Sequence, residues 1–197
     1  MPDAPILISF IAASLVVLII PGPGVLYVVA RSLSQGRCAG FVSAFGLSVG
    51  VFAHVFAAAG GLSALLLTSA TTFMIVKYLG AVYLVYLGIQ AFRSNSSLKQ
   101  QTFLPPQPPV RLFLDGVIIS VFNPKVAIFF LAFLPQFVSS ASGSAGTQIL
   151  KLGVLYSVLA LITDSTYGFM AASLKAKLVH RSSWDRVLRY SAGSLFI

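Results

Sequence analysis

Long apolar runs, separated by short polar segments, make up most of the chain. Five of them reach the roughly 20 apolar residues that a membrane-spanning helix needs. They cover residues 6–30, 41–67, 73–92, 112–138 and 153–174. A sixth run opens at Val187 and continues to Ile197; at about 1.5 Å per residue it covers about half a bilayer, so the sixth helix is either short or truncated. The pattern predicts an all-α, polytopic membrane protein with six transmembrane helices.

The composition excludes a soluble domain. Hydrophobic residues make up 57% of the chain and charged residues 9%, whereas soluble domains carry about 25% charged residues. No basic residue precedes the first apolar run, so no cleaved signal peptide is expected. The single cysteine, Cys38, forms neither an internal disulfide nor a Cys-x-x-Cys redox pair. The sequence contains no metal-ligand cluster, phosphate-binding loop or dinucleotide motif, and no cofactor or metal is expected.

The net charge of +9 comes mainly from basic residues in the loops between the apolar runs. The first, third and fifth loops are basic, whereas the second and fourth are uncharged. The basic residues of the odd loops are Arg31, Arg37, Arg93, Lys99, Arg111, Lys175, Lys177, Arg181, Arg186 and Arg189. Because Lys and Arg are enriched in cytoplasmic loops, the odd loops are predicted in the cytoplasm and the N-terminus outside. This topology explains the charge without a nucleic-acid partner.

Two of the apolar runs are interrupted by residues that break helices. The interruptions are Pro21, Gly22, Pro23 and Gly24 in the first run and Asn123, Pro124 and Lys125 in the fourth. Proline lacks an N–H donor and clashes with the preceding turn, but it suits the first position of a helix that resumes. Helices resuming at Pro23 or Gly24 and at Pro124 would direct their N-terminal amides toward the middle of the membrane, where they favour an anionic group such as a carboxylate. The alternative is that these prolines only kink the helices for packing.

The chain divides at a linker into two halves with one plan. Residues 5–92 and 112–197 each start with a broken helix, and residues 93–111 form a proline-rich linker. Three spans per half make the second half inverted relative to the first, as in secondary transporters, whose paired breaks mark the substrate site. We therefore predict one membrane transporter domain over residues 1–197, built from two inverted three-helix repeats.

Three ionisable residues inside the apolar runs are candidates for function. Lys125 and Asp164 fall at comparable depths, and intramembrane charges are costly and point to function. Asp164 would bind a substrate ammonium group or exchange a proton, or it would form a structural ion pair with Lys125. His54 is either a neutral histidine bonded to a backbone carbonyl or a proton relay, because its pKa lies near neutrality.

The segment Gly46-Leu47-Ser48-Val49-Gly50 matches the Gly-x-Ser-x-Gly pattern of hydrolases. That pattern requires a strand–turn–helix context, whereas here it lies within a continuous apolar run. Glycines four residues apart are instead typical of a close helix-packing face.

Several short motifs together resemble those of the LysE/RhtB family of amino-acid exporters. They are Pro21-Gly22-Pro23, the stretch 77–84 with Gly88, Asn123-Pro124-Lys125, Phe129-Phe130 and Pro135-Gln136-Phe137. The resemblance covers nearly the whole chain. It implies six spans in the bacterial inner membrane and proton-driven efflux of amino acids such as lysine, threonine or homoserine.

The resulting hypothesis is a secondary transporter, not an enzyme, that exports small zwitterionic metabolites. The substrate carboxylate would lie between the two breaks beside Lys125, and Asp164 would serve the substrate ammonium or the coupling proton. Two alternatives stay open: an intramembrane hydrolase using Ser48 and His54, and a membrane scaffold using the glycine faces and the proline-rich loop. Self-association into a homo-oligomer is also left open.

Overall fold

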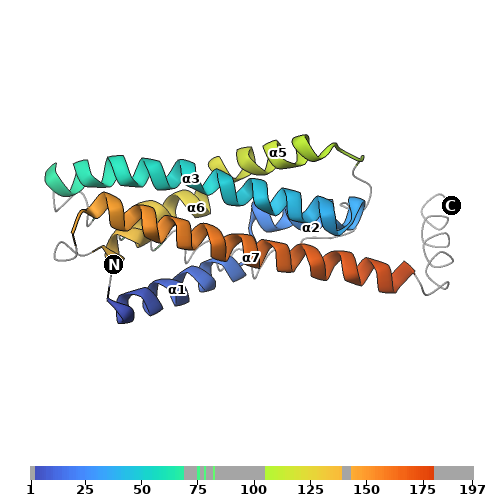
Figure 1. Ribbon diagram of the computed structural model, residues 1–197, viewed down its shortest axis with the longest axis horizontal. Helices are drawn as coiled ribbons and strands as arrows, with labels where there is room; N and C mark the ends of the chain where they lie inside the picture. Colours follow the sequence, from blue (N-terminus) through green and yellow to red (C-terminus); the bar gives the residue numbers. More distant parts are fainter. Residues whose placement is uncertain are drawn as a thin grey trace.

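A computed structural model describes residues 3–68, 75, 78, 82, 105–138 and 143–179 of the chain. In these residues the regular structure is helical, with six α-helices followed or joined by short π- and 3₁₀-helical turns (Figure 1). The predicted all-α class is thus confirmed for the described part of the chain. Most of the third predicted span and all of the sixth lie outside the described residues.

The first apolar run folds as two helices with a sharp bend between them. Helix α1 covers Ala4–Ile19 and α2 covers Pro23–Gln35. The two axes are bent by 58°, and α2 resumes at Pro23, one of the two predicted positions. Only Gly36, with φ of +89°, separates α2 from α3 (Arg37–Thr68), so the first loop is a single residue rather than the longer segment that we predicted. Glycine suits this left-handed conformation because it lacks a Cβ atom.

The fourth run is also broken where the sequence predicts. Helix α5 covers Pro109–Val121, and α6 covers Pro124–Ile128, continuing as a π-helical turn over Phe129–Phe133 and a 3₁₀ turn over Leu134–Phe137. The bend here is 48°. Helix α7 covers Ala145–Val179 and is longer at both ends than the predicted run 153–174, because polar residues flanking the apolar core continue the helix.

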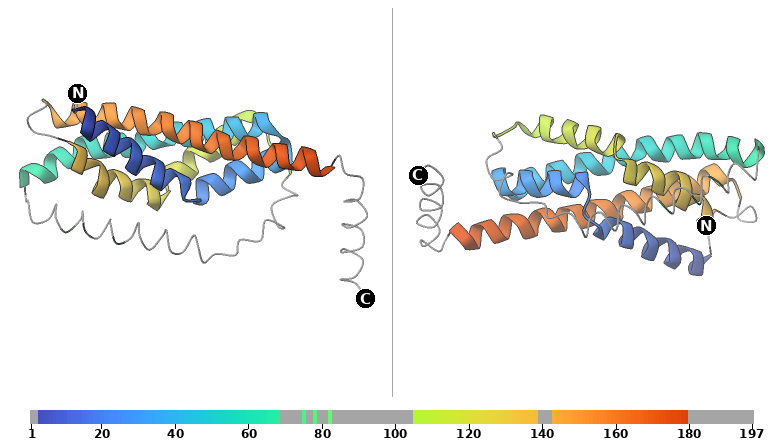
Figure 2. Two further views of the ribbon diagram at one scale, coloured as in Figure 1. Left: turned by 90° about the horizontal axis from the view of Figure 1, so that it is seen from below. Right: turned by 180° about the vertical axis from the view of Figure 1, so that it is seen from behind.

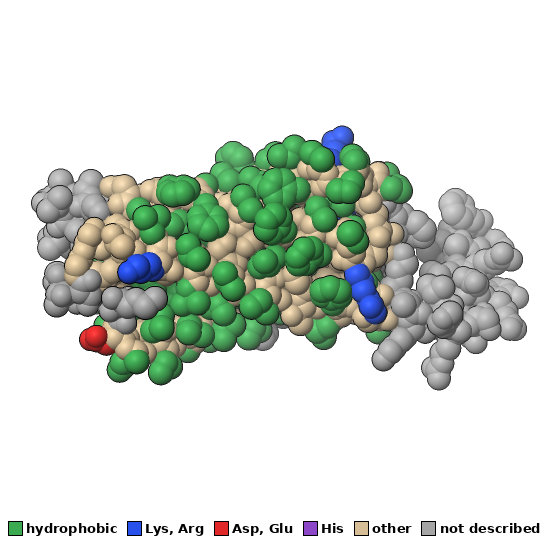
Figure 3. Space-filling model, in the orientation of Figure 1, with side chains coloured by type: hydrophobic (Ala, Val, Ile, Leu, Met, Phe, Trp, Pro, Cys, Tyr) green, Lys and Arg blue, Asp and Glu red, His purple; other side chains and the backbone are tan. Residues whose placement is uncertain are grey.

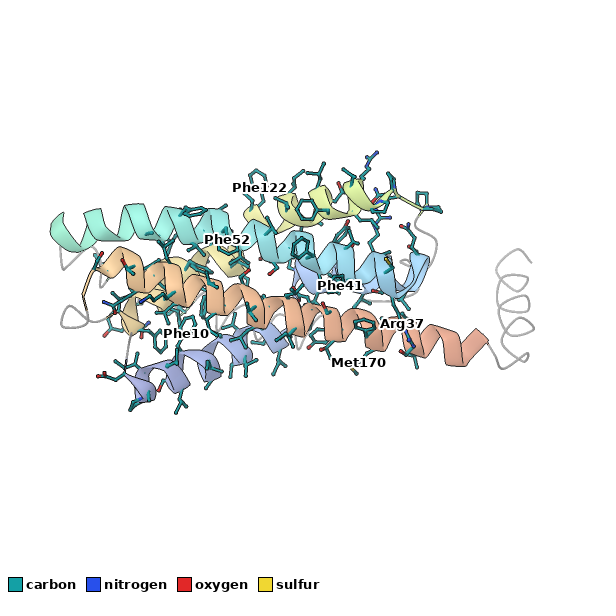
Figure 4. All side chains as sticks on the ribbon, viewed as in Figure 1. Phe10, Arg37, Phe41, Phe52, Phe122 and Met170 are labelled. Atoms are coloured by element: carbon teal, nitrogen blue, oxygen red, sulfur yellow. The ribbon has the colours of Figure 1, made fainter. Side chains whose placement is uncertain are left out.

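Two of the described helices, within Arg37–Gly60 and Ala145–Leu174, are long and apolar enough to cross a membrane, and the number rises to four if each bent pair is one span. Hydrophobic side chains cover the middle of the face shown in Figure 3, and charged side chains lie near its ends. Figure 4 places Phe122 and Met170 on the outside of the bundle, where they are 80% and 65% exposed. An apolar exterior of this kind fits a lipid environment.

Helix α3 lies between α5 and α7, and α1 lies on the far side of α7 (Figures 1 and 2). The core is centred on buried aromatic rings, and Phe10 of α1 lies between α1 and α7 (Figure 4). The ring of Phe129 packs at 4.6 Å from that of Tyr156 and at 6.1 Å from that of Phe10, measured between centroids. These aromatic contacts join α1, the second broken helix and α7 around one core.

The end of the proline-rich linker is bonded to helix α2. Gln35 Nε2 donates to the carbonyl of Gln107 at 2.9 Å, and the amide of Gln107 donates to Gln35 Oε1 at 3.1 Å. Arg31 Nη1 donates to the carbonyl of Pro105 at 3.2 Å. Pro108 has the extended backbone (φ −65°, ψ 151°) of a polyproline segment. This part of the linker is therefore held against the bundle.

Glycines bring α3 and α5 into close contact. A Cβ atom added to Gly46 would collide with the backbone of Phe113, and one added to Gly50 would lie 2.6 Å from the carbonyl oxygen of Val117. Gly116 of α5 faces back toward Gly46. The predicted role of the glycines in helix packing is confirmed.

Replacing Gly46 with alanine is expected to lower the free energy of unfolding by about 1–3 kcal/mol, because the new methyl group meets backbone that cannot rotate away. Gly60, on the same helix, is the matched control, since a Cβ atom there meets nothing within 4 Å. Thermal unfolding of the purified protein in detergent measures the difference. Equal midpoints for Gly46→Ala and Gly60→Ala would contradict the packing role.

Candidate functional site

The two helix breaks face each other inside the bundle. The pair α1–α2 and the pair α5–α6 run in opposite directions (Figure 1), so the end of α1 meets the start of α6. Lys125 Nζ donates hydrogen bonds to the carbonyl oxygens of Val17 at 3.0 Å and Ile20 at 2.7 Å. These carbonyls have no partner within α1 because the helix ends there. Lys125, which lies at the break in the fourth span, therefore provides hydrogen bonds to the carbonyl groups left free at the break in the first span.

Two further groups at the breaks are also bonded. The hydroxyl of Tyr167 on α7 donates to the carbonyl of Ile19 at 2.7 Å. The side chain of Asn123 accepts a hydrogen bond from the amide of Lys125 at 3.0 Å and caps the start of α6. Asparagine is among the preferred residues at this position. A broken helix within a membrane needs such partners, because lipid offers none.

The start of α2 keeps its first amides available. Gly22 is the N-cap and contributes no side-chain bond. The first intrahelical bond runs from the amide of Leu26 to the carbonyl of Gly22 at 3.0 Å, so the amides of Gly24 and Val25 precede the hydrogen-bonded ladder. A helix start of this kind carries partial positive charge and attracts anions.

A cavity of about 30 Å³ lies between the two breaks, α3 and α7. Its walls come from both broken spans and from the middle of α3 and α7. The lining residues are Leu18, Gly22, Gly24, Val25, Leu47, Val51, Ser120, Asn123, Lys125, Val126, Tyr156, Ala160 and Asp164. A cavity that holds a benzene molecule measures about 150 Å³. The walls must therefore move apart before an amino-acid-sized molecule fits.

Two opposite charges line this cavity. Lys125 and Asp164 are both 8% exposed. They attract each other through space, but no direct ion pair joins them. Lys125 has three N–H donors, of which two bind α1, and no described residue donates a hydrogen bond to the carboxylate of Asp164. One ammonium donor and one carboxylate are thus available to a ligand in the cavity.

The structure brings most of the predicted site residues to this cavity. Gly22, Gly24, Asn123, Lys125 and Asp164 line it. Pro21, Pro23 and Pro124 do not line it but create the two bends.

His54 lies outside the cavity lining. Its Nε2 donates to the carbonyl of Ser120 at 3.0 Å, and its ring stacks on Phe130 with centroids 6.3 Å apart. This geometry matches the predicted bond to a backbone carbonyl. Since Ser120 itself lines the cavity, the proton-relay role stays a prediction.

Ser48 and His54 do not form a nucleophile–base pair. Ser48 Oγ lies 2.7 Å from the carbonyl of Ser157 and donates to it, and Ser157 Oγ donates in turn to the carbonyl of Ser48 at 2.8 Å. This reciprocal pair ties α3 to α7. Both hydroxyls therefore serve helix packing.

Sequence reasoning missed the contribution of α7 apart from Asp164. Tyr156 and Ala160 line the cavity on the same face of α7, since residues at i, i+4 and i+8 share one side of a helix. Counting back from Asp164 at helical spacing identifies both positions. Ser120, Leu47 and Val51 carry no comparable signal, because they resemble the other apolar or small residues of their helices.

The chain matches the sequence profile of the LysE type translocator family over residues 15–197. It is 29% identical over 189 residues to a homoserine/homoserine lactone efflux protein of Salmonella typhi, covering 96% of this chain and 91% of that protein. It is 26% identical over 190 residues to a leucine efflux protein of Enterobacter sp. (strain 638), covering 96% and 90%. An uncharacterized membrane protein of Vibrio cholerae is 30% identical over 172 residues, covering 87% and 83%. No solved structure matches the chain.

Proposed function

The chain belongs to the LysE type translocator family, and from this premise we propose that it exports amino acids or related small zwitterionic metabolites across the bacterial inner membrane, driven by the proton gradient. Members of this family are transporters rather than enzymes, so the hydrolase alternative is wrong. A scaffold without transport is likewise at odds with relatives that are efflux proteins.

The observation that carries the proposal is the pair of opposite charges in one cavity between two facing helix breaks. An amino acid carries a carboxylate and an ammonium group. The carboxylate is bound by the remaining donor of Lys125 and the first amides of α2, and the ammonium by Asp164. Each group then meets a partner of opposite charge at a depth where lipid and apolar side chains offer none.

Transport requires this cavity to open on each side of the membrane in turn. The antiparallel arrangement of the two broken spans supports an inverted repeat, in which one half rocks against the other around a central site. The small cavity volume fits an occluded state of such a cycle. We further propose that the N-terminus faces outward and that Asp164 releases or takes up the coupling proton when the substrate ammonium leaves or binds.

The names of the relatives suggest which solutes to test first. Two of the relatives are named as homoserine and leucine efflux proteins. Homoserine and leucine share the amino-acid backbone but differ in the side chain. A site that holds the shared ammonium and carboxylate through Asp164 and Lys125 suits this common part.

The test is efflux from bacterial cells preloaded with dipeptides that release single amino acids, with and without this protein. We expect faster export of at least one amino acid and loss of the effect when an uncoupler collapses the proton gradient. Unchanged efflux of every amino acid, with the folded protein present in the membrane, would contradict the proposed function. Export that survives the uncoupler would contradict only the proton coupling.

A further inference from the structure

Tyr156 has a polar group that no described residue binds. Its side chain is fully buried, and among the described residues its hydroxyl oxygen has no hydrogen-bond partner. Most buried polar groups are hydrogen-bonded, and leaving one unpaired is costly. A tyrosine in such a place, where phenylalanine would fill the same space, points to a partner that arrives from outside the protein.

The position of Tyr156 suggests what that partner is. Tyr156 lines the same cavity as Asp164 and Lys125, two helical turns before Asp164 on the same face of α7. Between them lies Ala160, whose small side chain also lines the cavity. A ligand held at its ammonium group by Asp164 can therefore extend along α7 toward Tyr156.

The ring of Tyr156 is fixed by its neighbours. Phe129 and Phe130 pack against it with centroids at 4.6 Å and 5.2 Å, the second in an edge-to-face arrangement. Because both rings come from the π-helical turn that follows the second break, Tyr156 is held by the same segment that carries Lys125. A hydroxyl held in this way is preorganised, and little side-chain entropy is lost when it binds.

We propose that the Tyr156 hydroxyl is the side-chain specificity group of the exporter and hydrogen-bonds an oxygen on the side chain of the transported amino acid. The inference rests on the proposed function and deepens it, because it names the substrate class: amino acids with a hydroxyl or carbonyl oxygen on a short side chain. An apolar side chain of the same size leaves the hydroxyl unpaired and is disfavoured. Three residues then bind three parts of the substrate: Lys125 binds the carboxylate, Asp164 the ammonium group and Tyr156 the side chain.

The test compares homoserine with norvaline, which has a methyl group in place of the hydroxyl and nearly the same shape. Purified protein in proteoliposomes is assayed with each amino acid at several concentrations, and the ratio of their transport efficiencies is measured. The unmodified protein is expected to favour homoserine by about tenfold, the usual worth of one hydrogen bond. Tyr156→Phe is expected to bring the ratio near one, mainly through weaker transport of homoserine.

Ser14→Ala is the matched control. The Ser14 hydroxyl is also fully buried and has no hydrogen-bond partner among the described residues, but Ser14 does not line the cavity. Its removal is expected to leave the homoserine-to-norvaline ratio unchanged.

The outcomes separate this inference from the proposed function. If the unmodified protein transports no amino acid, the proposed function fails. If it transports both and Tyr156→Phe lowers both rates equally or leaves the ratio unchanged, only the role of Tyr156 is overturned. The second result would assign the hydroxyl to helix packing or to the Asp164 carboxylate instead.

Discussion

Asp164→Asn is expected to lower the initial rate of amino-acid export by about 100-fold. The variant removes the negative charge that faces the substrate ammonium, and a charge-assisted hydrogen bond is worth up to about 3 kcal/mol, or about 100-fold in affinity. The change keeps the size of the side chain, so the cavity and the helix around it are preserved. Initial rates of efflux from preloaded cells measure the effect.

A second assay on Asp164→Asn distinguishes its two proposed roles. In proteoliposomes, substrate can exchange with substrate without a net flow of protons. If Asp164 only carries the coupling proton, this exchange survives while uphill export is lost. If Asp164 binds the substrate ammonium, both are lost.

The matched control is Asp115→Asn, another carboxylate in a broken span, which lies outside the cavity lining. It is expected to keep export. Export by Asp164→Asn equal to that of the unmodified protein would overturn both roles of Asp164.

Lys125→Met is expected to remove export and also to destabilise the protein by about 3 kcal/mol. The ammonium group bonds the carbonyls of Val17 and Ile20 at 3.0 Å and 2.7 Å, and its loss leaves these two acceptors unpaired at the end of α1. It also leaves the buried charge of Asp164 without its counter-charge. Thermal unfolding in detergent and efflux rates measure the two effects on the same preparation.

The double variant Lys125→Met, Asp164→Asn separates charge balance from helix closure. Removing both charges is expected to restore part of the lost stability, because no buried charge is then uncompensated, while export stays absent. Lys151→Met changes an exposed lysine of α7 and controls for the loss of one positive charge. A double variant as unstable as Lys125→Met would show that the charge of Asp164 contributes nothing to the effect.

The two helix breaks show which structural features can be predicted from a few consecutive residues. The positions of both bends, the resumption of the helices at Pro23 and Pro124 and the glycine packing face were all predictable, because each depends on a few consecutive residues. The lengths of the helices were predicted less well. Helix α7 continues to Val179 past the apolar run, since polar residues that can reach water do not end a helix.

Lys125 and Asp164 show what such local patterns do not predict, namely the bonding partners of a buried charge. Intramembrane charge marks both residues as functional candidates, and equal depth suggests an ion pair. In the structure Lys125 instead binds carbonyls 105 and 108 residues earlier in the chain, and no described residue donates a hydrogen bond to Asp164. Whether the Lys125 ammonium group binds an acidic side chain or the carbonyls of a helix end depends on which of them helix packing brings within hydrogen-bond distance.

The amino-acid sequence was sufficient for the class of protein, the helix breaks and the charged candidates, because hydrophobicity and backbone geometry act over neighbouring residues. The meeting of the two breaks, the cavity between them and the unpaired hydroxyl of Tyr156 arise from contacts between helices far apart in the chain. Many apolar residues can form the same helix, and only their packing selects which side chains share one cavity.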